Sequence, residues 1–382
     1  MIVRIADNIV SPLGFSSEEN YRAVKGGKSA LRLYQNHFDI PEPFTASLFE
    51  EGKIEQQFST LHSTKQYTDF EKIIILSVSK ALQQTNVNPA SEKVQIVIST
   101  TKGNISLLDD NKDGFPSDRV HLGTTAQVIA DYFGNPNPPI VISNACISGV
   151  CAQITAIRYL QSGRCDTAIV VGADIQSRFI VSGFQSFKAL SPDACKPFDA
   201  DRCGLNLGEA AATIIYSKKE SKDIKENDWI AVRGAIRNDA NHISGPSRTG
   251  EGSYRALRAI LHERDREQIA FVNSHGTSTA YNDEMESIAI TRAELQSVPV
   301  NSLKGYYGHT MGAAGILESI ISMQAVDDKT VLGTRGFSKI GVSHPLVLSS
   351  QNTTTDKQAF IKLLSGFGGC NAALLFKKGA LI

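Results

Sequence analysis

One cysteine stands where a thiol is readily made reactive. Cys146 lies within Ser-Asn-Ala-Cys-Ile-Ser-Gly, between a short β-rich run and a segment with helical periodicity. Its sulfur is therefore expected at a helix N-terminus, where unpaired N–H groups and the helix dipole stabilise a thiolate. The small neighbours suit a tight turn that presents a nucleophile. The alternative is a buried structural cysteine.

A histidine follows a second buried β-rich run, in Asn-Ser-His-Gly-Thr-Ser-Thr. His275 leaves this strand into a turn of small and hydroxyl residues, from which a side chain can point into a cleft. Asp283 and Glu286 follow, three positions apart, and can share a helix face. A polar surface histidine is the alternative interpretation.

A lysine and a further histidine lie five positions apart around two glycines. Lys304 and His309 precede the small run Gly-Ala-Ala-Gly at 312–315, which allows a helix to approach another backbone closely. Glu318 lies further along that helix and can pair with Lys304. Packing alone also explains the small residues.

A glycine loop with one aromatic residue, Phe367, joins two apolar strands at 366–369. It lacks the spacing of a phosphate-binding loop, and no helix follows it, so a tight hairpin is its simplest interpretation. One cysteine and two histidines in separate glycine-rich turns indicate thiol chemistry on an acyl group. A cysteine hydrolase needs one histidine. Two histidines with a lysine indicate that negative charge on a second carbonyl is stabilised.

Alternating β-rich and helical segments position these residues and predict an α/β fold. Strands are predicted at residues 1–10, 94–100, 139–143, 167–172, 211–216, 229–236, 270–273, 298–301, 359–364 and 372–376. Helices are predicted to begin at a capping-box pattern at 16–19 and to cover 70–84, 147–161, 252–262 and 312–326.

The charged, apolar-poor segment at 217–228 is the best internal boundary, so we expect two halves, residues 1–222 and 223–382. Each half places a reactive residue directly after a buried strand: Cys146 in the first and His275 in the second. This pattern predicts two similar halves that meet at one site. Residues 103–118 are rich in turn formers and charges and are interpreted as a surface loop.

Composition excludes several classes of protein. The 382 residues carry a formal net charge of +0, so bulk charge predicts neither nucleic-acid nor membrane-surface binding, although a local basic patch remains open. No apolar run approaches the roughly 20 residues that span a bilayer, and the N-terminus lacks a signal-peptide pattern. Six cysteines without CxxC pairs favour a reducing compartment, so we expect a cytoplasmic protein.

An ordered set of motifs resembles the elongating β-ketoacyl-acyl-carrier-protein synthases of the thiolase superfamily. The matching stretches are residues 10–14, 143–149, 172–174, 183–184, 189–191, 197–199, 208–209, 275–279, 304–309, 312–315 and 366–369. Each is modest alone, and the specificity lies in their order and spacing. The resemblance implies a thiolase-like αβαβα layered fold of two pseudo-repeated halves.

The resemblance also implies roles for the candidate residues. Cys146 takes an acyl group from the phosphopantetheine arm of an acyl carrier protein, and a malonyl carrier then binds. His275 and His309 stabilise the enolate that forms as carbon dioxide leaves. Lys304 supports the site electrostatically with Glu318. Asp283 and Glu286 are supporting residues.

The remaining implied roles concern binding and gating. The backbone N–H groups of Cys146 and Phe367 form the oxyanion hole, and the Phe367 ring gates the second substrate. Thr277 and Thr279 hold the pantetheine arm, and Arg202 contacts the acidic carrier protein. No metal or cofactor of the enzyme itself is expected, and the assembly is a homodimer or a heterodimer of ketosynthase and chain-length factor.

Several positions depart from the usual pattern of this family. Asn144 replaces a small or hydroxyl residue, Cys203 replaces a common aspartate, and Cys370 replaces the threonine after the glycine loop. The segment at 103–118 is short by comparison. These departures favour a specialised synthase of polyene or polyketide assembly over the main fatty-acid elongator.

Other members of the superfamily, and a purely structural protein, fit less well. A non-catalytic chain-length partner lacks the nucleophile that Cys146 supplies. A thiolase has a second active cysteine before its terminal glycines, whereas Cys370 follows them. An initiating synthase uses one histidine and one asparagine. The sequence does not identify the acyl chain or the cognate carrier.

Overall fold

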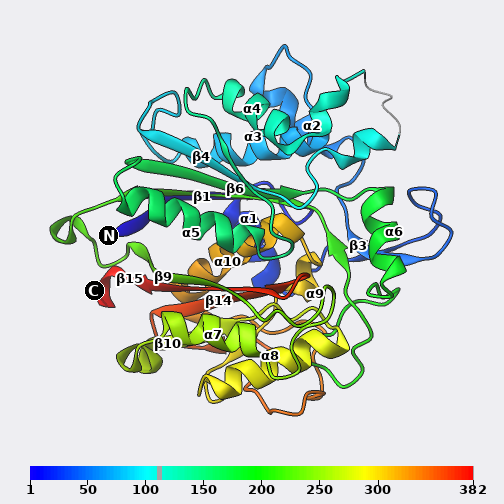
Figure 1. Cartoon of the computed structure of the whole chain (residues 1–382), viewed down its shortest axis with the longest axis vertical. Helices are drawn as coiled ribbons and strands as arrows, with labels where there is room; N and C mark the ends of the chain where they lie inside the picture. Colours follow the sequence, from blue (N-terminus) through cyan, green and yellow to red (C-terminus); the bar gives the residue numbers. More distant parts are fainter. Residues whose placement is uncertain (110–113, 382) are drawn as a thin grey trace.

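The computed structural model describes residues 1–109 and 114–381. Ten strands form one hydrogen-bonded series in the order β11-β10-β14-β15-β9-β1-β8-β6-β4-β5. The first five and the last five belong to different halves of the chain, joined where β1 pairs briefly with β9. Figure 1 shows these halves as two stacked sheets with helices above, between and below them. The five layers confirm the αβαβα fold.

The two sheets repeat the same topology. In each sheet, one strand is parallel to both of its neighbours. The next two strand pairs, counted toward the contact between β1 and β9, are antiparallel. The first sheet contains β1 (Ile2–Val10), β4 (Val94–Ser99), β5 (Ile140–Ile142), β6 (Thr167–Asp174) and β8 (Ala210–Lys218). The second contains β9 (Trp229–Asn238), β10 (Ile269–Asn273), β11 (Val300–Asn301), β14 (Ala359–Gly366) and β15 (Cys370–Lys378).

Helices fill the other three layers (Figure 1). The outer layer of the first half contains α3 (Asp69–Leu82) and α4 (Leu122–Tyr132), and that of the second contains α7 (Glu251–Ile260) and α8 (Ala280–Arg292). Between the sheets lie α5 (Ser148–Gln161) and α10 (Ala314–Asp327). Nearly every residue of α10 is buried, as expected for a helix with a sheet on both sides.

The two central helices meet through glycine. A Cβ atom at Gly149 would lie 2.9 Å from the Gly312 carbonyl oxygen, and one at Gly315 would lie 2.5 Å from the Val150 nitrogen. Any larger residue would therefore separate the N-terminal ends of α5 and α10. This close approach confirms the packing role expected for the small run at 312–315, and it brings the beginnings of both helices to one place.

Smaller elements surround this frame. They are α1 (Ser17–Lys25), β2 (Arg32–Tyr34), β3 (Phe44–Ser47), α2 (Lys53–Phe58), α6 (Arg178–Ser186), β7 (Leu207–Gly208), α9 (Lys304–Tyr307), β12 (Thr330–Val331) and β13 (Thr353–Thr354). The capping box predicted before α1 is present at Ser16 and Glu19.

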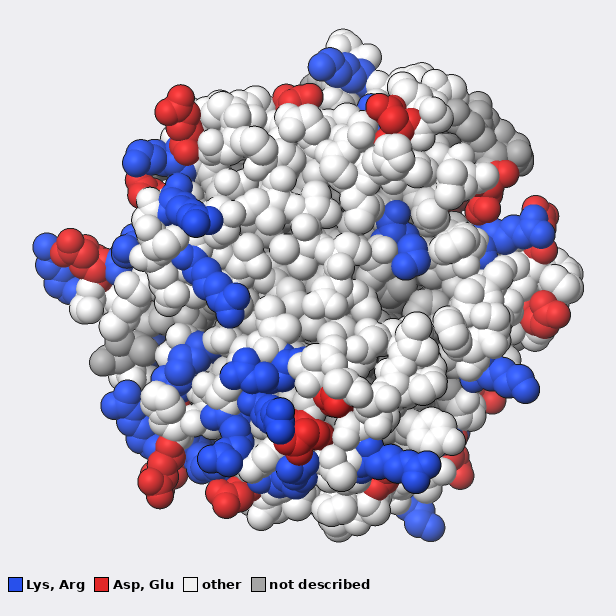
Figure 2. Space-filling view, viewed as in Figure 1, with Lys and Arg blue, Asp and Glu red and all other residues white. Residues whose placement is uncertain are grey.

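The expected surface loop at 103–118 contains the short 3-10 turn Ile105–Leu108 and overlaps the start of a second, Ser117–Val120, and its residues 110–113 lie outside the described part of the chain. No helix among the described residues is long and apolar enough to cross a membrane. Figure 2 shows Lys and Arg side chains gathered on the lower part of one face, where α7 lies, so the zero net charge hides an uneven distribution.

Candidate active site

Cys146 lies in a sharp turn between β5 and α5. The preceding residue, Ala145, has a φ of 45°, in the left-handed region that side chains rarely adopt. The Ser148 hydroxyl holds this turn: it accepts a hydrogen bond from the Asn144 N–H at 2.8 Å and donates to the Ala145 carbonyl at 2.6 Å. The strained turn raises the Cys146 sulfur toward the space between the two halves, as a nucleophile requires.

Two buried carboxylates of α8 hold the turn that carries His275. Glu286 accepts the backbone N–H groups of His275 and Gly276, both at 2.7 Å. Asp283 accepts those of Thr277 at 3.0 Å and Ser278 at 3.1 Å. Their expected position on one face of a helix is therefore correct. Both side chains fix the backbone of the turn and leave the imidazole of His275 free to face the cysteine.

His309 lies in a segment whose backbone forms a parallel bridge with Leu207. Its N–H donates to the Asn206 carbonyl at 2.7 Å, and its carbonyl accepts the Gly208 N–H at 3.0 Å. The Met311 N–H donates to Nδ1 at 3.2 Å, so this nitrogen carries the lone pair and the proton is on Nε2. Nε2 is buried and has no partner in the described structure.

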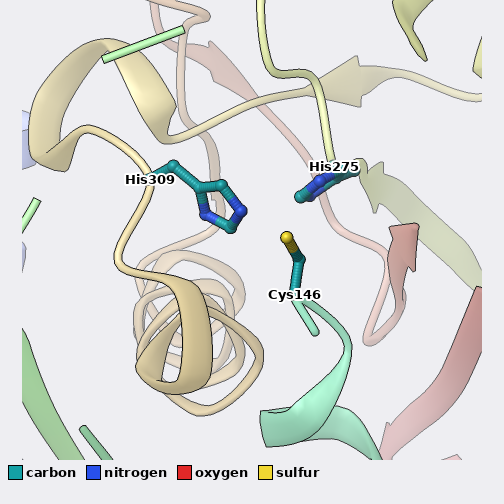
Figure 3. A group of neighbouring side chains, drawn as sticks. All are labelled: Cys146, His275 and His309. Carbon is teal, nitrogen blue, oxygen red and sulfur yellow. The ribbon is translucent and has the colours of Figure 1, made fainter. Parts of the chain in front are cut away.

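The three side chains converge on one point (Figure 3). A ligand atom of each of Cys146, His275 and His309 lies within 4.8 Å of those of the other two. The sulfur comes from the first half of the chain and both imidazoles from the second. The site is therefore complete only when the two halves are packed together. The positions of Cys146 and His275, each directly after a buried strand, predicted this arrangement.

Both imidazoles are neutral at physiological pH. Burial lowers the pKa of His275 and His309 well below the usual value, and the nearby ammonium groups of Lys304 and Lys362 lower the pKa of both rings further. A neutral imidazole has one N–H donor and one acceptor. Two such donors aimed at one point can bind a carbonyl oxygen and the negative charge that develops on it.

The thiol of Cys146 differs from expectation. Its position before α5 predicted a stabilised thiolate, but burial raises its pKa to about 12, and Cys370 adds to this rise. The side chain is only 8% exposed, and removal from water disfavours the anion more strongly than the helix terminus favours it. Cys146 is therefore a neutral thiol in the resting site and must lose its proton during reaction.

Lys304 and Glu318 form the predicted ion pair, fully buried behind the histidines. The cluster holds a second cation that the sequence reasoning missed. Lys362, in the middle of β14, lies 2.6 Å from the other carboxylate oxygen of Glu318. Its signal in the sequence is a single charged residue within an apolar strand, a placement that usually requires a buried partner.

Phe367 lies at the tip of the β14–β15 hairpin and is half-buried. Its ring contacts Phe184 and Phe187 at the end of α6, with centroid distances of 5.9 and 5.4 Å. Its backbone N–H points toward the sulfur of Cys146. A Cβ atom on the adjacent Gly366 would lie 3.1 Å from the Cys146 nitrogen, so the two proposed oxyanion-hole donors are neighbours.

A cavity of about 80 Å³ opens above the three catalytic candidates. Thr277 and Thr279 line it, with their hydroxyl groups 3.0 Å apart. Arg202 lies next to this wall and donates to the Thr279 carbonyl at 3.4 Å and the Ala280 carbonyl at 3.1 Å. This volume holds only a few water molecules, so an acyl chain needs a rearrangement of the walls. Phe367 is one of these walls.

Two of the three departures from the family pattern, Asn144 and Cys370, lie beside the Cys146 turn and the Phe367 loop. The Asn144 amide is 3.9 Å from the sulfur of Cys151, and the Cys370 sulfur is 3.2 Å from the Phe367 carbonyl. Cys203 is exposed, with its sulfur 3.1 Å from the Ser191 hydroxyl. All six cysteines are free thiols.

One sulfur and two imidazole nitrogens also have the composition of a zinc site. The surrounding charge opposes a metal, because two ammonium groups lie behind the histidines and the Glu318 carboxylate between them is already paired with both. The same positive charge favours an anionic intermediate. The donors therefore fit an oxyanion better than a cation.

The two-half, five-layered fold and the converging thiol and imidazoles fit an acyl-transfer enzyme. The matching family models are the N-terminal domain of β-ketoacyl synthase over residues 2–221 and its C-terminal domain over residues 230–338. The chain belongs to the β-ketoacyl synthase family and is a condensing enzyme of the acyltransferase type, which acts in fatty-acid or polyketide elongation.

Similar proteins cover nearly the whole chain. The 3-oxoacyl-acyl-carrier-protein synthase 2 of Vibrio cholerae is 28% identical over 405 residues and covers 97% of each chain. A ketosynthase in complex with its chain length factor from Xenorhabdus doucetiae superposes with a TM-score of 0.86 at 23% identity. The ishigamide ketosynthase/chain length factor gives a TM-score of 0.86 at 24% identity. Both structures cover 99% of this chain and 98% of their own.

Proposed function

We propose that this enzyme extends an acyl chain by decarboxylative condensation with a malonyl thioester on an acyl carrier protein. The observation that carries the proposal is the convergence of the Cys146 thiol with two neutral imidazoles, His275 and His309, within 4.8 Å. A thiol holds the acyl group, and two N–H donors stabilise an enolate. A hydrolase has no use for the second donor.

In the first step, the Cys146 sulfur attacks the thioester carbonyl of an acyl carrier. The oxygen becomes negative and is held by the backbone N–H groups of Cys146 and Phe367. The intermediate then collapses, the pantetheine sulfur leaves, and the proton lost by the thiol ends on that sulfur. The acyl group remains on Cys146, and no net charge remains in the buried site.

In the second step, a malonyl thioester places its carbonyl oxygen against the N–H donors of His275 and His309. The bond to the carboxylate breaks, carbon dioxide leaves, and the electron pair forms an enolate. The enolate carbon attacks the acyl carbonyl on Cys146. The cysteine sulfur is expelled as a thiolate and takes up one proton from solvent, and the product leaves as a 3-oxoacyl thioester.

The other candidate residues have supporting roles. Asp283 and Glu286 fix the turn of His275, and Lys304 with Glu318 supplies charge behind both histidines. Thr277 and Thr279 hold the pantetheine arm through the cavity that they line. Arg202 fixes the backbone at the start of α8 and adds positive charge beside this cavity for an acidic carrier.

The proposed partners are an acyl carrier protein and a second subunit, either another copy or a chain-length factor. Among the described strands, β5 pairs only with β4, so its other edge is open to strand pairing across an interface. Six free thiols support a cytoplasmic, reducing location. The departures at Asn144, Cys203 and Cys370 support a specialised polyene or polyketide pathway. The enzyme needs no cofactor besides the carrier's phosphopantetheine.

The proposal is tested by incubating the purified enzyme with an acyl carrier and a malonyl carrier from a panel of chain lengths. Mass spectrometry of the carrier should detect the 3-oxoacyl product, and carbon dioxide should appear in equal amount. Release of free fatty acid without carbon dioxide would indicate hydrolysis and contradict the proposal.

A further inference from the structure

Lys362 is a buried cation in a cage of four oxygen atoms. Its Nζ lies 2.6 Å from the Asn273 side-chain oxygen, 3.2 Å from the Asn273 carbonyl and 3.1 Å from the Ser274 carbonyl. The fourth oxygen is the Glu318 carboxylate oxygen at 2.6 Å. The lysine is fully buried. Such a buried charge is costly unless it is fully paired, and here every contact is to an oxygen.

The cage is fixed by the surrounding structure. The Asn273 amide donates to the Asn301 side-chain oxygen at 2.9 Å, and the Asn301 amide donates to the Leu332 carbonyl at 3.1 Å. This chain orients the Asn273 oxygen toward the ammonium group. Asn273 and Ser274 are also the last residues before His275. The lysine therefore anchors the strand end from which this histidine projects.

Glu318 lies between two cations. One of its oxygens pairs with Lys304 and the other with Lys362. With Lys304 alone, the buried group would be electrically neutral. Lys362 adds a second ammonium group behind the two histidines, although burial lowers the pKa of this lysine to about 8. The buried carboxyl of Glu286 also faces Lys362, and burial raises the pKa of that carboxyl to about 7. Among described residues, this is the only buried pair of lysines that shares one carboxylate.

We infer that Lys362 is a positioning residue of the condensing reaction, which anchors the His275 turn and adds positive charge to the cluster behind both histidines. The inference rests on the proposed function, because the charge matters only where an anion forms at His275 and His309. In the decarboxylation step this charge stabilises the enolate and keeps both imidazoles neutral, with their single N–H groups directed at the substrate.

The electrostatic effect has a definite sign. Lys362 lowers the pKa of His275 and of His309, together with Lys304. Removal of the Lys362 charge should therefore raise the pKa of both imidazoles. Protonation of His309 at Nδ1 would remove the acceptor for the Met311 N–H, and with it the hydrogen bond that orients the ring. The charged and titratable groups that face Lys362 are Glu318, Lys304, Glu286, His275 and His309.

The test uses Lys362→Gln, which removes the charge and keeps an N–H donor, and Lys362→Met, which fills the same space. The matched control is Lys377→Met. Lys377 is a buried lysine of the neighbouring strand, paired with Asp265 at 2.6 Å and Gln268 at 2.8 Å, away from the histidines. Malonyl-carrier decarboxylation is measured across pH, with rates counted per folded enzyme by acylation of Cys146.

In both Lys362 variants, the acidic limb of the rate profile should move to higher pH, and the maximal rate should fall roughly tenfold, less than for removal of a direct donor. Lys377→Met should lose stability without moving the limb. An unmoved limb in the folded Lys362 variants, or an equal shift in Lys377→Met, overturns the inference. Failure of the wild-type enzyme to decarboxylate would instead contradict the proposed function.

Discussion

The imidazole rings of His275 and His309 lie 4.9 Å apart between centroids and are nearly perpendicular, with an interplanar angle of 80°. The two rings come from different segments in the second half of the chain. Both face the thiol of Cys146, which belongs to the first half. Because burial and the two lysines lower the pKa of both rings, they can approach each other without repulsion between positive charges. This pair of neutral donors distinguishes the site from a simple cysteine–histidine hydrolase.

Removal of either imidazole should separate the two half-reactions. In His275→Ala and His309→Ala, malonyl decarboxylation should fall by roughly 10²–10³, the usual effect of one lost oxyanion donor. Transfer of the acyl group to Cys146 should survive better, since the oxyanion hole proposed for that step consists of backbone N–H groups. Separate assays of carbon dioxide release and enzyme acylation measure this. Normal condensation by either variant would remove that histidine from the mechanism.

The resting thiol should behave as a weak acid. Burial raises the pKa of Cys146 to about 12, so its thiolate fraction keeps increasing as pH rises. The rate of alkylation by a small reagent should therefore increase across the accessible pH range without levelling off near the ordinary value of 9.0. A Cys203→Ala background removes the exposed competing thiol. A plateau at neutral pH would show a preformed thiolate.

The Phe367 ring should act as a gate. It is half-buried, contacts two aromatic residues of the α6 region and follows a glycine hinge. Phe367→Ala should fold, lose less than the roughly 3–5 kcal/mol typical of a core phenylalanine, and accept the malonyl carrier before acylation. Thermal melts and order-of-addition assays check this. A severely destabilised variant with normal ordering would indicate a packing role.

A tight backbone crossing should make Gly208 indispensable for the position of His309. A Cβ atom there would lie 1.9 Å from the Tyr307 carbonyl oxygen. Gly208→Ala should cost about 1–3 kcal/mol or more of unfolding free energy and reduce condensation, because the backbone that carries His309 must move. Gly183→Ala is the control, since a Cβ atom at that position would have no neighbour within 4 Å among the described residues outside the adjacent residues and backbone of its own helix. Equal stability of the two variants would contradict this account.

The periodic segments and the catalytic candidates could be predicted from the sequence. Strand runs such as residues 94–100 and the capping box before α1 encode their structure locally. For helix α8, only the shared helix face of Asp283 and Glu286 was predicted, without bounds, because these buried carboxylates obscure the usual amphipathic pattern. Lys362 was missed since its partners, Glu318 and Asn273, are distant in sequence. The neutral thiol depends on burial, which no local pattern reveals.

The most direct test is intact-protein mass spectrometry of the enzyme before and after each substrate. With an acyl carrier alone, one acyl group should appear on the peptide that contains Cys146, and malonyl carrier should then discharge it with release of carbon dioxide. Cys146→Ala should show neither event, and Cys151→Ala should show both. An acyl adduct on another residue, or chain extension by Cys146→Ala, would contradict the assignment of Cys146 as the nucleophile.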